Sequence, residues 1–372
     1  MRIAIVGPTF PYKGGGAHHT TELAHRLTAA GHDVVLESWR AQYPAVLYPG
    51  QLTISEPEGE PFAGTRRELS WRRPDGWFRT GRRLRSCDLV VLTVLTPVQV
   101  PAYLGILAGL RTGRRGGKPR PQVVALCHNV LPHERKTYDA PFMRLLLRRV
   151  DRTLVHSTEQ AAVARSLAPD GRGEPDAARL CVAELPPHLP ARRTAADRMA
   201  EPYGRLLFFG VVRPYKGLDV LLHALAAGPP GVSLTVAGEF WSDLEETRRL
   251  IDSLGLADRV DLRPGYVPAA EIPGLFAKVD AMVLPYRAAT ASQNVWMAHE
   301  HGVPVISTRA GALADHVRDG VDGLLCEPGD VGSLTDALKR FYADGEPARL
   351  RDGVRPVDAE PYWAAYIRTL LG

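Results

Sequence analysis

The feature that most constrains the fold is an alternation, along the whole chain, of short apolar runs with segments of helical periodicity. The runs are rich in β-branched residues, as expected of strands buried on both faces of a parallel sheet. Helical patterns such as Leu218–Ala227 and Glu245–Gly255 separate most of them. This alternation predicts an α/β fold of doubly wound, Rossmann-like units. The expected strands lie at residues 3–6, 34–37, 88–95, 122–129, 152–157, 205–212, 233–239, 259–267, 280–286 and 304–308.

The length of 372 residues predicts two domains, because one hydrophobic core rarely serves so long a chain. Leu185–Gly204 is rich in proline, alanine and charge and is the best linker candidate. In doubly wound sheets ligands lie outside the carboxyl ends of the strands. We therefore expect two sheets facing each other across a cleft.

Composition excludes several classes of protein. No run approaches the roughly 18 apolar residues of a membrane span, and no secretion-like signal precedes the first strand. The four cysteines are scattered and form no C-x-x-C, so neither a zinc site nor a disulfide framework is expected. The expected location is the cytoplasm. A further hypothesis is that the protein binds peripherally at the inner face of the membrane.

Positive charge is concentrated in the first half of the chain. Residues 1–190 carry 26 Lys and Arg against 17 Asp and Glu, whereas residues 191–372 carry 20 against 24. The surplus lies mainly in segments 65–85 and 111–120, the first of which also holds two tryptophans. The segments are either a solvated arginine-rich surface or a surface for an anionic membrane or a phosphate-bearing acceptor. No nucleic-acid-binding module accompanies the charge, so nucleic acid is not an expected partner.

Three consecutive glycines, Gly14–Gly16, follow the first expected strand and precede a helix. A helix N-terminus behind glycines can receive a phosphate. The P-loop pattern fails because Lys13 precedes the glycines. The dinucleotide fingerprint has His19 at its third glycine position, although Glu37 occupies the place of a ribose-binding acid. A nicotinamide dehydrogenase is thus a minor alternative. The glycines either form a plain turn or allow a ligand or another domain to approach the backbone closely.

The sharpest signal is FFGVVRPYKGLDVLLHAL, at residues 208–225. An expected strand ends at Gly210, and the following loop presents Arg213 and Lys216 before a helix begins near Gly217. Arginine binds phosphate oxygens bidentately and lysine acts as a point charge. The spacing therefore indicates a diphosphate site.

Here the chain resembles the retaining glycosyltransferases of GT-B fold that use nucleotide-sugar donors, of the glycosyltransferase group 1 type. The segment HGVPVISTRAGALADHVRDGVDGLL (301–325) matches the family pattern most specifically. The other matching segments are residues 14–34, 125–134, 210–217, 236–239 and 264–268. The resemblance implies an acceptor-side domain at 1–195, a nucleotide-sugar-binding domain at 203–357, and a terminal helix at 358–372 that packs back on the first domain.

The resemblance also implies roles for individual residues. Arg213 and Lys216 would hold the donor diphosphate and stabilise the leaving group, and His128 would face the donor sugar. Gly15 and Gly16 would let the backbone of the first domain approach the donor. The other donor-binding candidates are Gly238, Glu239, Tyr266 and Val267, at turns expected to receive the base, and Val295.

The chain departs from the family at two glutamates that commonly grip the donor sugar and the ribose. Ala289 and Met297 occupy those positions here. Glu300, one turn beyond Met297 on the same expected helix, is either a partial substitute or a solvated surface residue. Ser292, Gln293 and Asn294 are expected to cap the same helix and to offer N–H groups to the diphosphate or the sugar.

The implied reaction is transfer of a sugar from a UDP-, GDP- or dTDP-sugar with retention of configuration. Arg213, Lys216 and helix N-termini can neutralise the departing diphosphate, and the chain has no Asp-x-Asp, so we expect neither metal nor other cofactor. The acceptor would be lipid-linked, a glycan or a small molecule. Tyr12, His18 and Glu134 are acceptor candidates by location alone. The alternatives are a nucleotide-sugar epimerase or phosphorylase on the same fold, and a non-catalytic nucleotide-sugar- or glycan-binding protein.

Overall fold

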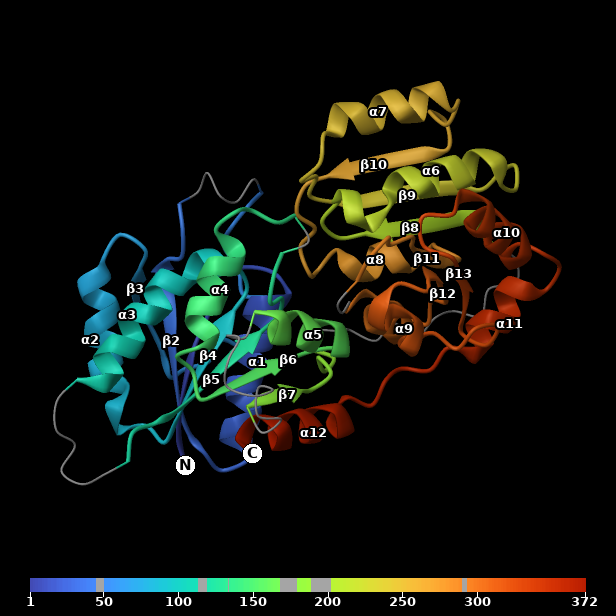
Figure 1. Ribbon diagram of the computed structural model, residues 1–372. Helices are drawn as coiled ribbons and strands as arrows, with labels where there is room; N and C mark the ends of the chain where they lie inside the picture. The colour runs from blue at the N-terminus through green and yellow to red at the C-terminus, as the bar shows by residue number, and fades with distance from the viewer. Residues whose placement is uncertain (45–49, 113–118, 133, 168–178, 189–201, 290–292) are drawn as a thin grey trace. The chain divides into compact units, whose positions relative to one another are not determined.

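A computed structural model describes residues 1–44, 50–112, 119–132, 134–167, 179–188, 202–289 and 293–372. The chain divides into two compact units (Figure 1). Unit 1 comprises Met1–His188 and Ala359–Gly372, and unit 2 comprises Leu189–Asp358. The chain therefore crosses between the units twice, once after His188 and once after Asp358.

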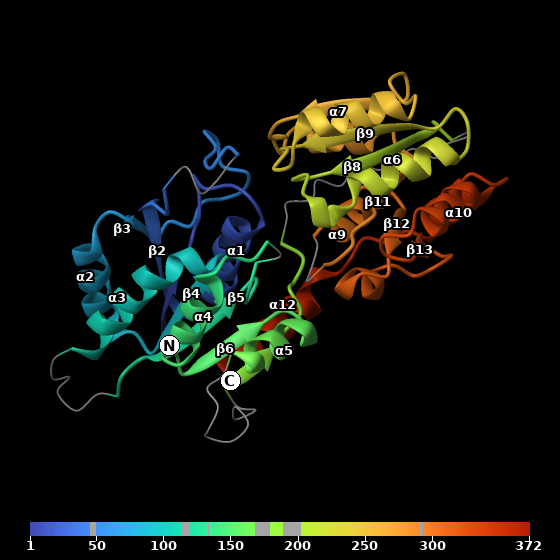
Figure 2. The same cartoon turned by 45° about the horizontal axis from the view of Figure 1, so that its top comes forward.

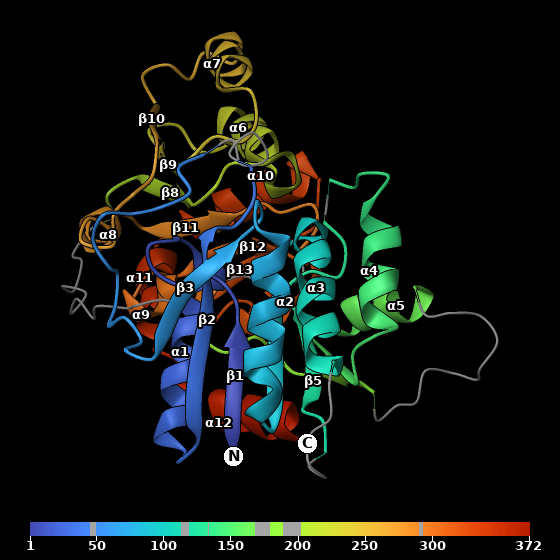
Figure 3. The ribbon, with the colours of Figure 1, turned by 90° about the vertical axis from the view of Figure 1, so that its left-hand side faces the viewer.

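Unit 1 is built, within the described residues, on seven parallel strands in the order β3-β2-β1-β4-β5-β6-β7 (Figures 1 and 3). The strands are β1 (Arg2–Val6), β2 (Asp33–Ala41), β3 (Thr65–Ser70), β4 (Leu89–Val94), β5 (Gln122–Cys127), β6 (Arg152–Val155) and β7 (Leu180–Val182). Ile3 of β1 pairs with Val34 of β2 on one side and with Leu89 of β4 on the other. The strand order reverses between β1 and β4, which is where ligands bind in doubly wound sheets.

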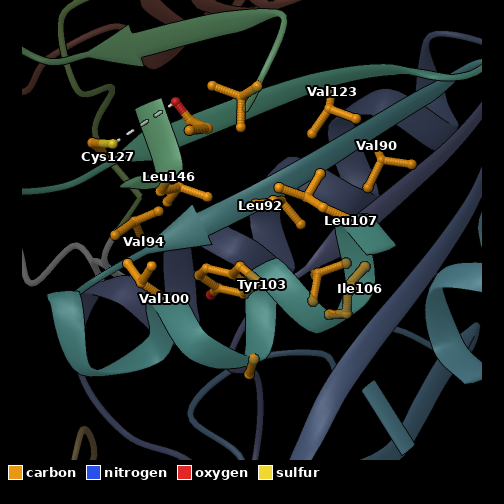
Figure 4. Close-up of a cluster of buried hydrophobic side chains, with 14 of the residues drawn as sticks. Val90, Leu92, Val94, Val100, Tyr103, Ile106, Leu107, Val123, Cys127 and Leu146 are labelled. Atoms are coloured by element: carbon orange, nitrogen blue, oxygen red, sulfur yellow. Dashed lines mark hydrogen bonds between the residues drawn. The ribbon is translucent and has the colours of Figure 1, made fainter. Parts of the chain in front are cut away.

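The two faces of this sheet follow from the alternation of side chains along each strand. Ile3 and Ile5 of β1 enter one apolar cluster and Ala4 and Val6 enter another. Figure 4 shows part of the second cluster, where Val90, Leu92 and Val94 of β4 pack on helix α3. Helices α3 (Val100–Arg111), α4 (Asp139–Leu147) and α5 (Thr158–Ser166) contribute to this face, and α1 (Gly15–Ala29) and α12 (Ala359–Leu371) contribute to the other.

Helix α2 (Pro74–Arg83) packs closely on α3, and glycines of both helices lie at the contact (Figure 3). A Cβ built on Gly81 of α2 would lie 2.0 Å from the carbonyl oxygen of Ile106. A Cβ on Gly109 of α3 would lie 2.2 Å from the carbonyl oxygen of Phe78. Since no Cβ fits at these distances, the two helix backbones touch directly at this point.

Unit 2 holds, in its described part, six parallel strands in the order β10-β9-β8-β11-β12-β13 (Figures 1 and 2). The strands are β8 (Arg205–Phe209), β9 (Ser233–Gly238), β10 (Val260–Pro264), β11 (Ala281–Leu284), β12 (Val305–Thr308) and β13 (Gly323–Cys326). The order reverses between β8 and β11. Leu206 and Phe208 face α6 (Leu218–Ala227), α7 (Leu244–Ser253), α10 (Val331–Phe341) and α11 (Glu346–Gly353), and Leu207 faces α8 (Ile272–Phe276) and α9 (Asn294–Glu300).

The expected fold class is confirmed: both units are parallel α/β sheets covered by helices. Three strands, β3, β7 and β13, are additional to those expected from the sequence. Strand β3 lies inside the basic segment 65–85, and only its Leu69 is fully buried. Among the described helices, none is long and apolar enough to cross a membrane.

Candidate functional site

The candidate site of unit 2 begins where β8 ends, beside the reversal of strand order. Gly210 follows β8 with φ of 100°, a conformation that favours glycine. The N–H of Gly210 donates to the carbonyl of Ala237 at 2.9 Å, and a Cβ on Gly238 would lie 2.1 Å from the carbonyl oxygen of Gly210. The loops after β8 and β9 are therefore packed backbone to backbone.

Lys216 is the most unusual charged residue of this loop. It ends a short 3₁₀ helix, η4 (Pro214–Lys216), and its exposed fraction is only 9%. Its Nζ lies 5.3 Å from the centroid of the Tyr286 ring, and no described carboxylate forms a salt bridge with it. Burial lowers the pKa of Lys216, and the nearby Arg213 lowers it further. A buried cation without an acidic partner is costly, so the position points to an anionic ligand.

Arg213, the second cation, stacks on an aromatic ring. Its guanidinium carbon lies 4.0 Å from the centroid of the Trp241 ring, in the loop after β9. The backbone N–H of Trp241 donates to the carbonyl of Val212 at 3.0 Å, which holds this residue beside the loop that carries the arginine. Among the described salt bridges none involves Arg213. Such a cation–π contact orients the guanidinium without neutralising its charge.

Arg287 supports the loop from β11. It binds both carboxylate oxygens of Asp219, at 2.8 and 2.5 Å, and donates to the carbonyl of Pro214 at 2.8 Å. Its backbone N–H donates to the carbonyl of Tyr215 at 2.7 Å. Arg287 therefore fixes both the loop that carries Arg213 and Lys216 and the first turn of α6.

Helix α9 begins next to the end of β8. The side-chain amide of Asn294 donates to the carbonyl of Phe209 at 3.0 Å and contacts the hydroxyl of Tyr286 at 3.3 Å. Gln293 is half-buried at the start of this helix. The side chain of Val295 is fully buried in the apolar cluster, which leaves its backbone N–H, in the first turn of α9, for any contact with a donor. Ser292 lies outside the described residues.

The turns expected to receive the base lie at neighbouring strand ends. Gly238 ends β9 and Glu239, which follows it, is buried. The N–H of Gly265 donates to the carbonyl of Gly238 at 3.0 Å, which brings the turn after β10 beside the turn after β9. Tyr266 and Val267, in the turn after β10, are half-buried. The structure thus brings these turns to the same edge of the sheet as Lys216.

The positions of the two absent glutamates are apolar. Met297 is 5% exposed and belongs to the cluster formed by Leu207, α8 and α9. Ala289 packs against the same cluster. Glu300 is half-buried at the last residue of α9. An acid at position 297 would be buried among hydrocarbon side chains, so this chain has no vacant place for it.

In unit 1 the three glycines differ in their surroundings. Gly14 has φ of 88°, and α1 begins at Gly15. A Cβ on Gly16 would lie 2.6 Å from Leu95, just beyond β4, whereas one on Gly15 would lie 3.5 Å from Nε2 of His188. Gly16 therefore packs closely on the side chain of Leu95, and Gly15 lies against a histidine.

His128 follows β5 and is half-buried at the carboxyl edge of the sheet, where its backbone N–H donates to the carbonyl of Val94 at 3.0 Å. Around it lies a cluster of rings that the sequence did not predict. The ring centroids of His19 and His156 lie 4.9 and 5.0 Å from that of His128. His188 lies 5.1 Å from His19. The ring cluster is completed by Trp363 and Tyr366 of α12.

The histidines of the ring cluster are held neutral. Burial lowers the pKa of His156 to about 4, and that of His188 to about 4. Burial lowers the pKa values of His19 and His128 well below the ordinary value, and the other imidazoles lower them further. Nδ1 of His156 lies 3.2 Å from the carbonyl of Ala183, which sets an Nδ1–H tautomer.

The acceptor candidates have three different environments. Tyr12 is 6% exposed and packs in the core of unit 1, so its ring is a structural element. His18 forms an ion pair with Glu58 that ties the first turn of α1 to a neighbouring loop. Glu134 is exposed. The structure does not bring these three side chains together as one set.

Part of the positive charge of segment 65–85 is neutralised by a buried acidic residue outside the segment. Glu37 is fully buried and accepts from Arg83 at 3.0 and 2.7 Å. Because this carboxylate is occupied, it does not offer the open ribose-binding acid that the dehydrogenase alternative requires. Arg72 and Arg82 remain exposed on or beside α2, together with Phe78. Segment 111–120 lies largely outside the described residues.

Solved structures share this architecture. The Anabaena protein HepE, crystallised in complex with UDP, matches with a TM-score of 0.71 at 17% identity over 100% of both chains. The lipopolysaccharide outer core galactosyltransferase WaaB matches with a TM-score of 0.67 at 15% identity, over 100% of this chain and 99% of that one. Two Rossmann-like units with these neighbours define a GT-B fold.

Sequence matches then identify the family. Residues 13–172 match the profile described as Glycosyltransferase Family 4, and residues 204–344 match that described as Glycosyl transferases group 1. The chain belongs to the group 1 glycosyltransferases.

Named relatives match over part of their length. The D-inositol 3-phosphate glycosyltransferase of Mycolicibacterium smegmatis is 30% identical over 168 residues, which cover 44% of this chain and 38% of that protein. The protein of the same name from Frankia alni is 33% identical over 178 residues, covering 45% and 44%. The chain therefore matches less than half the length of these relatives.

Proposed function

We propose that the protein transfers a sugar from a nucleoside diphosphate sugar to an acceptor. The observation that carries this proposal is the Lys216 ammonium, nearly buried without a carboxylate partner among the described residues and next to Arg213. Both cations lie at the reversal of strand order in unit 2. A diphosphate there would supply the missing negative charge, and the cations would stabilise that charge as it grows on the leaving group.

The proposal includes retention of configuration without a metal ion. Arg213 and Lys216 are two positive charges at one site, enough to act on a departing diphosphate in the way that a divalent cation would. His128, neutral in its ring cluster, would support the donor sugar by hydrogen bonding and would not be a general base. On this proposal the donor phosphate takes the proton of the acceptor, so no carboxylate nucleophile is required.

We propose a UDP-sugar as donor and a phosphorylated polyol as the first acceptor to test. The donor class is supported by the structural neighbours crystallised with UDP and with UDP-glucose. The acceptor is suggested by the names of the curated relatives, which act on D-inositol 3-phosphate. GDP- and dTDP-sugars and glycan acceptors belong to the same screen.

The test compares Lys216→Met with Lys339→Met, an exposed lysine on α10. Nucleoside diphosphate release from UDP-sugars is measured without added metal, with and without acceptor. We expect Lys216→Met to lower kcat/KM about 100-fold and to abolish the thermal shift given by UDP. The unliganded variant should be at least as stable as the wild type, because a buried unpaired charge has been removed. Lys339→Met should behave as wild type, and a wild-type rate in Lys216→Met would refute the diphosphate site.

The same assay separates the alternatives. An epimerase would convert the nucleotide sugar without any acceptor, and a phosphorylase would convert it only when inorganic phosphate is added in place of a polyol or glycan. A non-catalytic binding protein would show the UDP shift, lose it in Lys216→Met, and release nothing with any acceptor. This second alternative is favoured by one observation, the apolar Ala289 and Met297 where the family has acids.

We also propose that α2 meets an anionic membrane surface. The support is the exposed arginines, Arg72 and Arg82, beside the exposed ring of Phe78. Basic residues near an anionic leaflet contribute about 1 kcal/mol each. Sedimentation with anionic vesicles measures this contact.

A further inference from the structure

The orientation of His19 is determined by packing alone. Within the described chain, neither of its ring nitrogens has a hydrogen-bond partner, and its side chain is fully buried. It stacks on Trp363, with centroids 5.6 Å apart and an interplanar angle of 16°. Tyr366 meets it edge-on at 5.2 Å. The rings of α12 therefore set the position of His19.

The position of the His128 ring depends in turn on its contacts with the rings of His19 and His156. Its Nε2 is buried and has no hydrogen-bond partner in the described part of the chain. His19 meets its ring at an interplanar angle of 88°, and His156 meets it at 61°. His156 itself stacks on Tyr366, with centroids 5.8 Å apart. Both neighbours of His128 are thus held by residues of α12.

The ring cluster lies where the chain leaves unit 1 and where it returns to it. The first leaves unit 1 after His188, whose ring contacts His19, and the indole N–H of Trp363 donates to the carbonyl of Pro187 at 2.9 Å. The second returns at Ala359, the first residue of α12, one turn before Trp363. Trp363 therefore joins the outgoing segment to the returning helix.

We infer that Trp363 and His19 are positioning residues for His128. They tie the ring of His128 to the two segments by which the chain enters and leaves unit 1. This inference rests on the proposed function in that His128 is taken to face the donor sugar. Small displacements of a group that contacts the reacting sugar lower the rate strongly. A change at Trp363, which has no ring contact with His128 among the described contacts, should therefore act on turnover through His128.

The experiment is a double-mutant cycle on kcat, with Trp363→Phe and His128→Ala in the full chain. Trp363→Phe keeps an aromatic ring and removes the hydrogen bond to Pro187. The matched control is Leu370→Val, a buried residue of α12 outside the ring cluster. We expect Trp363→Phe to lower kcat about tenfold with the donor KM within about twofold of wild type. In the His128→Ala background the same change should have less than about a twofold effect.

A second readout needs no turnover. In protein labelled with ¹⁵N-histidine, two-bond ¹H–¹⁵N spectra report the tautomer and surroundings of each ring. Trp363→Phe should shift the signals of His19 and His128, and Leu370→Val should leave them in place. Equal effects of Trp363→Phe in both backgrounds, or unchanged His128 signals, would overturn the inference while the proposed function stands. If the wild type turns over no nucleotide sugar, the proposed function fails. In that case unchanged His128 signals in Trp363→Phe would still refute the inference that Trp363 positions His128.

Discussion

At the scale of single residues, the histidines of the ring cluster make the stability of unit 1 depend on pH. The folded pKa of His156 is about 4, below its ordinary value of 6.5. The unfolded chain therefore binds more protons than the folded chain between these values, and stability falls as the pH is lowered. The groups around the cluster are His18, Cys127 and the guanidinium of Arg26 over Trp363, and among the described groups no carboxylate stabilises the protonated form of His156.

We expect the free energy of unfolding of unit 1 to fall by about 2 kcal/mol between pH 7 and pH 5 for His156, and by a similar amount for His188, whose folded pKa is also about 4. Replacing His156 by glutamine removes one titrating group and should flatten this dependence by that amount. Urea unfolding at several pH values measures it, with His223→Gln on α6 of unit 2 as the control. An identical pH dependence in wild type and His156→Gln would contradict the assignment.

The sequence predicted part of the candidate site residue by residue. Gly210, Arg213 and Lys216 were predictable because strand end, cations and helix start are neighbours in the chain. The ring cluster was not, because His19, His156 and Trp363 are distant in sequence and each alone is typical of a core residue. Trp241 and Arg287 were missed for a similar reason: their importance lies in contacts with Arg213 and Asp219 across two strands.

At the scale of elements, α2 and strand β3 before it carry most of the described basic segment. The residues of β3 show no period-two alternation of apolar side chains, because at the edge of the sheet only Leu69 is buried. Arg72, Arg79 and Arg82 remain exposed around α2, although Arg79 also contacts Asp75. The exposed charge is thus available for an anionic surface, within the part that the structure describes.

We expect the triple charge reversal Arg72→Glu, Arg79→Glu and Arg82→Glu to weaken binding to phosphatidylglycerol vesicles at least tenfold. The reason is loss of attraction to the anionic surface, so the effect should shrink as salt is raised. Co-sedimentation measures the binding, and phosphatidylcholine vesicles give the baseline. The matched control reverses Arg248 and Arg249, which are exposed on α7 of unit 2. Equal binding by the triple variant and the control would remove the membrane proposal.

At the scale of the whole molecule, each unit has its own hydrophobic cores. The clusters of unit 1 draw on α12 from the end of the chain, and those of unit 2 lie within Leu206–Leu350. The α/β class was predictable because buried strands and amphipathic helices alternate throughout. That α12 supplies rings to the site of unit 1 was not predictable from the pattern of α12 itself, which reads as an ordinary amphipathic helix.

Separate cores predict two calorimetric transitions, one for each unit. UDP, which would bind Lys216 and Arg213, should raise only the transition of unit 2. Leu126→Ala, in the core of unit 1, should lower only the transition temperature of unit 1, with a loss of about 2–5 kcal/mol in the free energy of unfolding of that unit. Leu338→Ala in the core of unit 2 is the converse control. A single transition that moves with both changes would show that the units unfold together.

The direct contact of α2 and α3 at Gly81 and Gly109 has an evolutionary consequence. Any side chain at either position would meet the backbone of the opposite helix, so a substitution at one cannot be compensated by a change at the other. Drift at this pair is possible only if the helices move apart. Homologues that keep the close approach should retain both glycines, and homologues that have lost either glycine should have a wider spacing between the two helices.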